Sequence, residues 1–375
     1  MKTISAVSRI VPALLLALLL AACSDDSGTS SSSEKGKLEP ARAPAFLKRG
    51  DKVALLSPSY FTPDSNVRKT ADVLRKWGYE PVVGAHVGEI HAGKYAGTAE
   101  ERAADFVAAL EDDSIKAILC NRGGYGTIQL VDLIDPKTVA KHPKWLVGFS
   151  DITTLHALET KAGVASVHGT MSSFIARTDG EDENSLLLRD LLAGKVPTYV
   201  LPKNALNRKG RAEGTLVGGN MATFVPLLGS SVDVFSDDGI VLFMEEVGES
   251  LHNIDRMFNS LELRGAMENV KGVILGEFED SGTDLDYASA EEMLSEYLAE
   301  YDIPVLCGFP AGHGDLNYPL VMGAKVVLDV DDDGATLSFD VGGTERRVEA
   351  GAPAARPVPA LSASLRKALA GKTFE

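Results

Sequence analysis

A single serine separates an apolar segment from a segment with helical character. The apolar segment follows Lys144 and ends at Phe149, Ser150 comes next, and a helix is expected over residues 153–161. A hydroxyl on a strand-to-helix turn is exposed close to backbone N–H groups and to the positive end of the helix dipole. Ser150 is therefore a candidate nucleophile. Serine is also a favoured helix N-cap, and this segment taken alone favours the capping role.

A serine hydroxyl is weak at neutral pH and needs a general base, which is most often a histidine. Among the seven histidines, His313 stands out because glycines flank it and because it follows a strand predicted over residues 304–308. Such loops are common places for catalytic residues, and glycine lets backbone and substrate come close. His168, at the end of a strand predicted over residues 165–168, is the alternative base.

The base in turn needs an acid that orients it. A hydrophobic strand predicted from Gly239 onward ends in two adjacent carboxylates, Glu245 and Glu246. Adjacent residues of a strand point to opposite faces, so only one of the two is expected to reach the site. We take Glu245 as the orienting acid and keep Glu246 as the alternative if the strand register differs. Taken alone, the motif favours two exposed carboxylates at a strand end.

The loop Gly123-Gly124-Tyr125-Gly126 offers backbone N–H groups that can face a developing oxyanion. The second donor would be the N–H of Asp151, the residue after the nucleophile. The loop has neither the dinucleotide-binding spacing nor the Gly-Lys-Ser/Thr of a phosphate-binding loop, which disfavours a phosphate cradle. No two histidines have the spacing of a zinc peptidase, so we expect neither a metal nor an organic cofactor.

The elements that must position these residues alternate between strand and helix from Gly50 onward. This order predicts an α/β fold with a doubly wound, mostly parallel sheet, whose functional loops lie at the carboxyl ends of the strands. Both the glycine loop and Ser150 follow predicted strands. The strands are expected over residues 52–57, 80–83, 115–120 and 165–168, and the helices over residues 64–77 and 98–111.

From Gly214 the segments become shorter and strand-like, which indicates a second, smaller and β-rich domain. Its strands are expected over residues 239–245, 270–276, 304–308 and 325–330, with a helix near 253–263. The predicted organisation has six parts: a signal peptide (1–22), a flexible tether (23–43), an N-terminal α/β domain with the nucleophile (44–180), a polar connection (181–213), a C-terminal β-rich domain with Glu245 and His313 (214–350), and an appendage (351–375).

The N-terminal residues read as a targeting segment, with Lys2 and Arg9 before an apolar core that is too short to span a membrane. The run Leu20-Ala21-Ala22-Cys23 resembles a bacterial lipobox, in which the cysteine is lipidated. Because serine follows Cys23, we expect a lipid anchor in the outer membrane, facing the periplasm or the cell surface. The alternative is ordinary cleavage after residue 22.

Charge and cysteine content narrow the class of protein further. The net charge of −16 and the lack of a basic groove exclude nucleic acid as an expected partner. The two cysteines after the lipobox, Cys120 and Cys307, both lie in apolar runs and are interpreted as small buried hydrophobic residues.

Several of these motifs occur in the order found in one enzyme family. They are Gly50-Asp51-Lys52-Val53, Ser57-Pro58-Ser59, Arg122-Gly123-Gly124-Tyr125-Gly126, Gly148-Phe149-Ser150-Asp151, His168-Gly169, Gly218-Gly219-Asn220, Leu242-Phe243-Met244-Glu245-Glu246, Ile254-Asp255-Arg256 and Gly312-His313-Gly314. The chain from about Gly50 to Val330 thus resembles the LD-carboxypeptidase family of serine peptidases, whose name-giving member is muramoyltetrapeptide carboxypeptidase.

The resemblance implies a triad of Ser150, Glu245 and His313, and an oxyanion hole formed by the loop at Gly124 and the amide of Asp151. It also implies a homodimer and a doubly wound domain followed by a smaller β-rich domain. The turn lacks the trailing glycine of Gly-x-Ser-x-Gly, so it is not the elbow of the α/β-hydrolases. Familiar cytoplasmic members carry no lipoprotein signal, which favours a substrate outside the inner membrane here.

The expected reaction is cleavage of the L,D bond before the terminal D-alanine of a murein tetrapeptide, in peptidoglycan turnover or recycling. Arg122 and Gly123 are the candidates for holding the substrate's terminal carboxylate. One alternative is an immunity-type peptidase of the same family that acts on peptidyl-nucleotides. Another is a catalytically silent lipoprotein that binds peptides or muropeptides at the surface.

Overall fold

The computed structural model describes residues 37–282 and 284–351. The predicted signal peptide, Cys23 and nearly all of the predicted appendage lie outside these residues, as does the tether up to residue 36. No helix in the described ranges is long and apolar enough to cross a bilayer.

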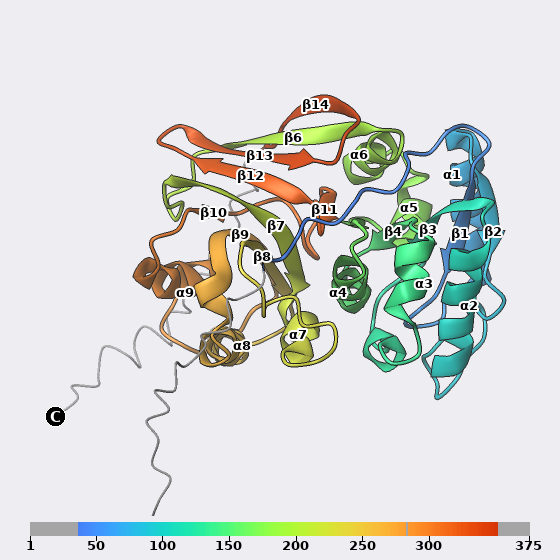
Figure 1. Ribbon diagram of the computed structural model, residues 1–375, viewed down its shortest axis with the longest axis horizontal. Coiled ribbons are helices and arrows are strands. Elements are labelled where there is room, and N and C mark those ends of the chain that lie inside the picture. The colour runs from blue at the N-terminus through green and yellow to red at the C-terminus, as the bar shows by residue number, and fades with distance from the viewer. Residues whose placement is uncertain (1–36, 283, 352–375) are drawn as a thin grey trace, which may run out of the picture. The chain divides into compact units, whose positions relative to one another are not determined.

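The elements follow the order that the sequence predicts over most of the first half of the chain (Figure 1). The strands are β1 (Lys52–Leu56), β2 (Glu80–Val83), β3 (Ile115–Cys120), β4 (Trp145–Gly148), β5 (Ser166–His168), β6 (Lys195–Pro202), β7 (Gly210–Asn220), β8 (Ile240–Val247), β9 (Val270–Glu279), β10 (Val305–Cys307), β11 (Leu320–Met322), β12 (Lys325–Val330), β13 (Gly334–Asp340) and β14 (Thr344–Glu349). The helices are α1 (Asp64–Trp77), α2 (Ala99–Glu111), α3 (Pro136–Lys141), α4 (Thr153–Lys161), α5 (Ser172–Thr178), α6 (Glu183–Leu192), α7 (Met221–Phe224), α8 (Leu251–Leu263) and α9 (Ala290–Tyr297).

The first sheet has the strand order β11-β5-β4-β3-β1-β2. All of its pairs are parallel except the pair of β11 with β5. The expected doubly wound, mostly parallel sheet is confirmed. Its carboxyl ends carry the glycine loop after β3 and Ser150 after β4.

Helices cover both faces of this sheet, because the side chains of each strand alternate between two cores. In β1, Ala54 and Leu56 belong to a core shared with α2, α3 and α4. The intervening Val53 and Leu55 belong to a second core, shared with α1, α5 and α6. The near-continuous apolar run of the strand follows from this burial on both sides.

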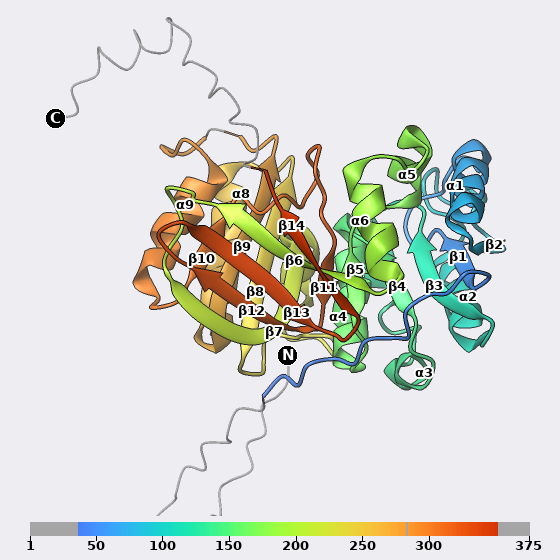
Figure 2. The ribbon, with the colours of Figure 1, turned by 90° about the horizontal axis from the view of Figure 1, so that it is seen from above.

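The second sheet has the order β10-β9-β8-β7-β12-β13-β6-β14. β10, β9, β8 and β7 are parallel, whereas β12 is antiparallel to both of its neighbours. α8 and α9 cover one face of the parallel part. The other face encloses a core built from β6, β7, β8, β12 and β13, around which the sheet curls (Figure 2).

Two of the strands that the sequence did not indicate pair across the predicted boundaries between the parts of the chain. β6, inside the predicted connection, pairs with β13 of the second sheet. β11, inside the predicted C-terminal domain, pairs with β5 of the first sheet. The chain between β10 and β11 therefore crosses from the second sheet to the first, and His313 lies on this crossing.

Candidate active site

Ser150 lies on a tight turn at the carboxyl end of β4. Its φ of 63° is in the left-handed region, which L-residues with a side chain rarely adopt and which costs about 1–3 kcal/mol. A single 3₁₀ turn, Ser150–Ile152, leads directly into α4. The N-cap positions of the 3₁₀ turn and of α4 are Phe149 and Ile152, so Ser150 is not the cap of either element. The strained turn places the hydroxyl beside His313, and both residues line one cavity.

His313 connects the serine to a buried carboxylate. Its Nε2 is 3.0 Å from Ser150 Oγ, and its Nδ1 is 2.7 Å from Glu245 Oε2. A carboxylate only accepts hydrogen bonds, so Nδ1 carries the proton in the neutral ring and Nε2 accepts from the serine hydroxyl. In this tautomer the unprotonated Nε2 faces the Ser150 hydroxyl and can accept its proton.

Burial and charge act in opposite directions on His313, whose side chain is 15% exposed. Burial alone lowers the pKa of the imidazole, but the adjacent Glu245 carboxylate outweighs it and raises the pKa above its usual value. The ring also packs on Phe149, with 5.0 Å between the ring centroids. The Glu245 side chain is fully buried, so its charge is poorly screened.

The two alternatives kept open by the sequence take other positions. Glu246 accepts hydrogen bonds from Asn220 Nδ2 at 2.8 Å and from the backbone N–H of Ala222 at 2.6 Å, on the far side of β8. Burial raises the pKa of Glu246 to about 7. His168 is buried, with Nε2 3.2 Å from Asn317 Oδ1. Neither side chain forms a hydrogen bond with Ser150.

The glycine loop approaches the serine closely. A methyl group on Gly123 would lie 3.0 Å from Ser150 Cβ and 3.2 Å from Ser150 Oγ. A methyl group on Gly124, whose φ is +120°, would lie 2.3 Å from the Tyr60 ring. Only glycine allows both contacts, and both bring the loop's backbone beside the turn that carries Ser150 and Asp151.

A cavity of about 410 Å³ opens over Ser150 and His313. Two cations line it: Arg122, from the glycine loop, and Arg177, from α5. Neither guanidinium forms an ion pair or hydrogen bond with another described residue, and each lies over an aromatic ring, Tyr60 and Phe174 respectively. The cavity therefore combines a serine hydroxyl, an imidazole and two positive charges, which suits a peptide that ends in a carboxylate.

The sequence motifs indicated Arg122 but not Arg177. Arg177 could have been found only from its position in the fold. It lies on α5, the short helix that follows β5 at the edge of the sheet where the functional loops lie. The Phe174 ring beside it is equally unmarked in the sequence.

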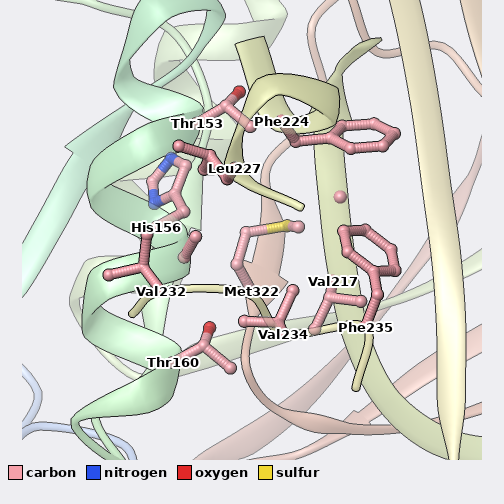
Figure 3. A pocket seen from close by; sticks show the side chains of 12 residues that line it. Thr153, His156, Thr160, Val217, Phe224, Leu227, Val232, Val234, Phe235 and Met322 are labelled. Atoms are coloured by element: carbon pink, nitrogen blue, oxygen red, sulfur yellow. The ribbon is translucent and has the colours of Figure 1, made fainter. Parts of the chain in front are cut away.

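A second cavity lies behind the site, between α4, α7 and β7. Figure 3 shows that its walls are mainly apolar, with Phe224, Phe235 and Met322 among them. Its volume is only about 10 Å³, room for about one water molecule. It is a packing void and holds no substrate.

Three potential metal ligands lie close together elsewhere in the described ranges, on His86, Glu89 and Glu101. Glu101 also closes the N-terminal capping box of α2 with Thr98. None of the three lines the cavity above Ser150.

Two family models match the chain in the order of its two sheets. Residues 53–169 match the N-terminal domain of LD-carboxypeptidases, and residues 213–328 match the C-terminal domain. The chain belongs to the LD-carboxypeptidase family. The matched ranges contain Ser150 in the first domain and Glu245 with His313 in the second.

Relatives of known name support this membership. The murein tetrapeptide carboxypeptidase of Pseudomonas aeruginosa is 31% identical over 289 residues, which is 74% of this chain and 93% of that protein. The crystal structure of muramoyltetrapeptide carboxypeptidase from Oxalobacter formigenes has a TM-score of 0.71 at 26% identity and covers 79% of this chain and all of that one. The microcin C7 self-immunity protein of Escherichia coli is 25% identical, over 80% of this chain and 97% of its own length. The family thus includes both murein carboxypeptidases and immunity relatives.

Proposed function

We propose that this LD-carboxypeptidase family member is a serine peptidase that removes the terminal D-alanine from murein tetrapeptides by cleaving an L,D bond. The observation that carries the proposal is the pair of contacts from His313 to Ser150 Oγ and to Glu245, at the floor of a cavity with two arginines. A protein that only bound peptides would have no need of this linked set.

In the first half of the reaction, Ser150 Oγ attacks the carbonyl carbon of the scissile bond while His313 Nε2 takes the hydroxyl proton. Negative charge then develops on the carbonyl oxygen. The backbone N–H groups of Gly124 and Asp151 are the proposed donors to this oxygen, as predicted from the sequence. The Glu245 carboxylate stabilises the imidazolium.

In the second half, the imidazolium of His313 gives its proton to the leaving nitrogen of D-alanine, and an acyl-enzyme remains on Ser150. Water then attacks the ester carbon while His313 takes one of its protons. The bond from this carbon to Ser150 Oγ breaks, the proton passes from His313 to Oγ, and the tripeptide leaves with a new carboxylate. Each proton transfer uses groups of this chain. Arg122, with Arg177 beside it, is the proposed partner of the carboxylate of the terminal D-alanine.

The test is incubation of the full-length protein with a murein tetrapeptide, followed by mass spectrometry, beside a Ser150→Ala variant. The wild type should release one D-alanine and the variant none. A tetrapeptide with a D-centre in place of the L-centre at the scissile bond should remain intact. A wild type that binds tetrapeptide in calorimetry but neither releases D-alanine nor reacts with a serine-directed fluorophosphonate would favour the binding lipoprotein.

A second candidate function is hydrolysis of peptidyl-nucleotides. It is favoured by the similarity to the microcin C7 self-immunity protein over most of both chains. The same serine, base and acid would serve, so the catalytic groups cannot separate the two functions. Incubation with an aminoacyl sulfamoyl adenosine tests it: hydrolysis faster than that of tetrapeptide would reverse our preference.

We also propose that Cys23 carries a lipid that holds the enzyme in the cell envelope, as an outer-membrane protein. The support is the apolar core followed by Leu20-Ala21-Ala22-Cys23. A Cys23→Ser variant should move from the membrane fraction to the soluble periplasmic fraction and should lose labelling by a clickable fatty acid. An unchanged distribution would contradict the anchor. The homodimer remains a family expectation, which sedimentation of the purified protein can test.

A further inference from the structure

The side chain of Asp151 points away from substrate, into the protein, although its backbone N–H is the proposed oxyanion donor. The carboxylate is 5% exposed. It accepts hydrogen bonds from Ser59 Oγ at 2.6 Å and from the Thr127 N–H at 3.0 Å. The Asp151 carbonyl also accepts from Thr127 Oγ1 at 2.5 Å. One residue thus ties the nucleophile turn to the loops that follow β1 and β3.

Arg102, on α2, forms hydrogen bonds to the same two loops. Its side chain is almost fully buried. Nη1 donates to the Pro58 carbonyl at 2.6 Å and to the Gly126 carbonyl at 3.0 Å. Nη2 donates to Gln129 Oε1 at 2.6 Å. A guanidinium with several fixed donors can hold two carbonyls at a set spacing, which a lysine ammonium cannot do as rigidly.

One peptide group lies between these two charges. Its C=O, from Gly126, faces Arg102, and its N–H, from Thr127, faces the Asp151 carboxylate. The dipole of the peptide is therefore aligned between a cation and an anion, which favours a single orientation of the loop. At the loop's other end, Gly123 lies so close to Ser150 that a methyl group in its place would be 3.0 Å from Ser150 Cβ.

The loop after β1 contributes to the same arrangement. Pro58 and Ser59 are held by Arg102 and Asp151, and the next residue, Tyr60, places its ring directly against Gly124. The position of the Gly124 N–H thus depends on both clamped loops, and the position of the Asp151 N–H depends on its own anchored side chain.

We infer that Arg102 and the Asp151 carboxylate are positioning residues that set the spacing of the two oxyanion donors, the N–H groups of Gly124 and Asp151. This inference rests on the proposed serine peptidase function. Because the donors stabilise charge that exists only in the tetrahedral state, their displacement should lower kcat and leave binding of the ground-state peptide nearly unchanged.

The experiment compares Arg102→Gln and Asp151→Asn with matched controls from loops of the C-terminal half of the chain, next to strands of the second sheet. Arg208→Gln is the arginine control, because Arg208 also holds backbone carbonyls, those of Leu298, Ala299 and Tyr301. Asp233→Asn is the carboxylate control, because Asp233 is also buried and accepts from backbone N–H groups, those of Gly229 and Phe235. Neither control residue lines the cavity above Ser150.

Three quantities are measured for each full-length variant: kcat and KM for D-alanine release, the affinity for a peptide boronic acid that forms a tetrahedral adduct with Ser150, and the melting temperature. Removing one oxyanion donor typically lowers kcat on the order of 100-fold to 1000-fold, and we expect about 30-fold or more for displaced donors. Boronate affinity should fall in parallel, with KM within about threefold of wild type. The controls should lower the melting temperature only.

Milder variants guard against loss of folding. Ser59→Ala removes one hydrogen-bond donor to the Asp151 carboxylate. Arg102→Lys keeps the positive charge but loses the fixed N–H donors of the guanidinium. Both variants should lose less kcat than the first two, and boronate affinity should fall by the same factor as kcat. The inference is overturned if the site variants keep wild-type kcat and boronate affinity, or if the controls lose as much as they do. A wild type that releases no D-alanine and resists fluorophosphonate would instead overturn the proposed function itself.

Discussion

Replacing Glu245 by Gln is the sharpest test of the proposed charge arrangement, because it changes one oxygen into an NH₂ group in a fully buried position. In the native site Oε2 accepts from His313 Nδ1, and Oε1 has no hydrogen-bond partner among the described residues. A glutamine can therefore turn either end toward the imidazole, and the cost of each orientation decides the outcome.

If the amide oxygen faces His313, the productive tautomer survives but the NH₂ group is left buried without an acceptor, at a cost of about 1–3 kcal/mol. If the NH₂ group faces Nδ1, that cost disappears, but the imidazole proton must move to Nε2. The ring then donates toward Ser150 and can no longer take its proton. The unproductive form should be favoured about 5-fold to 150-fold on this ground alone.

Loss of the carboxylate charge adds to this effect, because the imidazolium of the transition state is no longer stabilised. The two effects together should lower kcat on the order of 1000-fold to 10,000-fold, the range known for the corresponding change in serine peptidase triads. The acid limb of kcat/KM should also move to lower pH, since the carboxylate that raises the pKa of His313 is gone.

Glu159→Gln is the matched control for this substitution. Glu159 lies on α4, is 1% exposed and has no hydrogen-bond partner for either oxygen among the described residues. Burial raises the pKa of its carboxyl group well above the usual value, which favours the neutral acid that the amide resembles. D-alanine release is followed from pH 5 to 9. An E245Q enzyme within tenfold of wild type, with an unmoved acid limb, would refute the proposed role of Glu245.

The remaining predictions concern the base, the carboxylate clamp and the glycine loop. For the wild type, kcat/KM should fall as the pH drops through a value above 6.5, because the raised pKa leaves His313 protonated and unable to act as a base; half-maximal activity well below pH 6 would contradict this. Arg122→Gln should raise KM about 10-fold to 100-fold, the worth of a charged hydrogen bond, and Arg177→Gln should raise it less because that side chain is more exposed. A tetrapeptide with a C-terminal amide should be insensitive to either change. Gly123→Ala should lower kcat at least about 100-fold, because its methyl group would displace Ser150, whereas Gly88→Ala, which has open space around it, should not.

Local features of the fold were predictable from the sequence. α1 spans the predicted residues because its apolar positions recur at helical spacing and Gly78 ends it in the left-handed conformation. α2 begins where Thr98 and Glu101 form the predicted capping box. These signals lie within a few residues of each other and need no knowledge of the tertiary structure.

Pairings between distant segments were not predictable in the same way. β11 consists of three apolar residues, and nothing in them tells that they join the first sheet while their neighbours join the second. β6 lies within a segment whose flanking residues are polar, and its own residues likewise do not tell which sheet it joins. The roles of Arg102 and Arg177 could not be predicted from neighbouring residues either. An arginine on a helix is usually a surface residue, and its role becomes visible only when its tertiary contacts are known. The candidate triad was accessible because each member lies near the end of a strand or in the loop that follows it. There, a glycine or a change from apolar to polar residues is visible in the sequence.

Because the chain crosses between the sheets from β10 to β11, the activity of the site depends on the position of one sheet relative to the other. The nucleophile is anchored to one sheet and its acid–base partners to the other, joined by the 3.0 Å contact between His313 Nε2 and Ser150 Oγ. A slip of about 1 Å between the sheets should cost on the order of 100-fold in rate, long before any strand separates. In a denaturant titration, turnover should therefore vanish at a lower denaturant concentration than the far-UV circular dichroism signal. Activity should therefore be lost when the two sheets shift relative to each other, before either sheet unfolds.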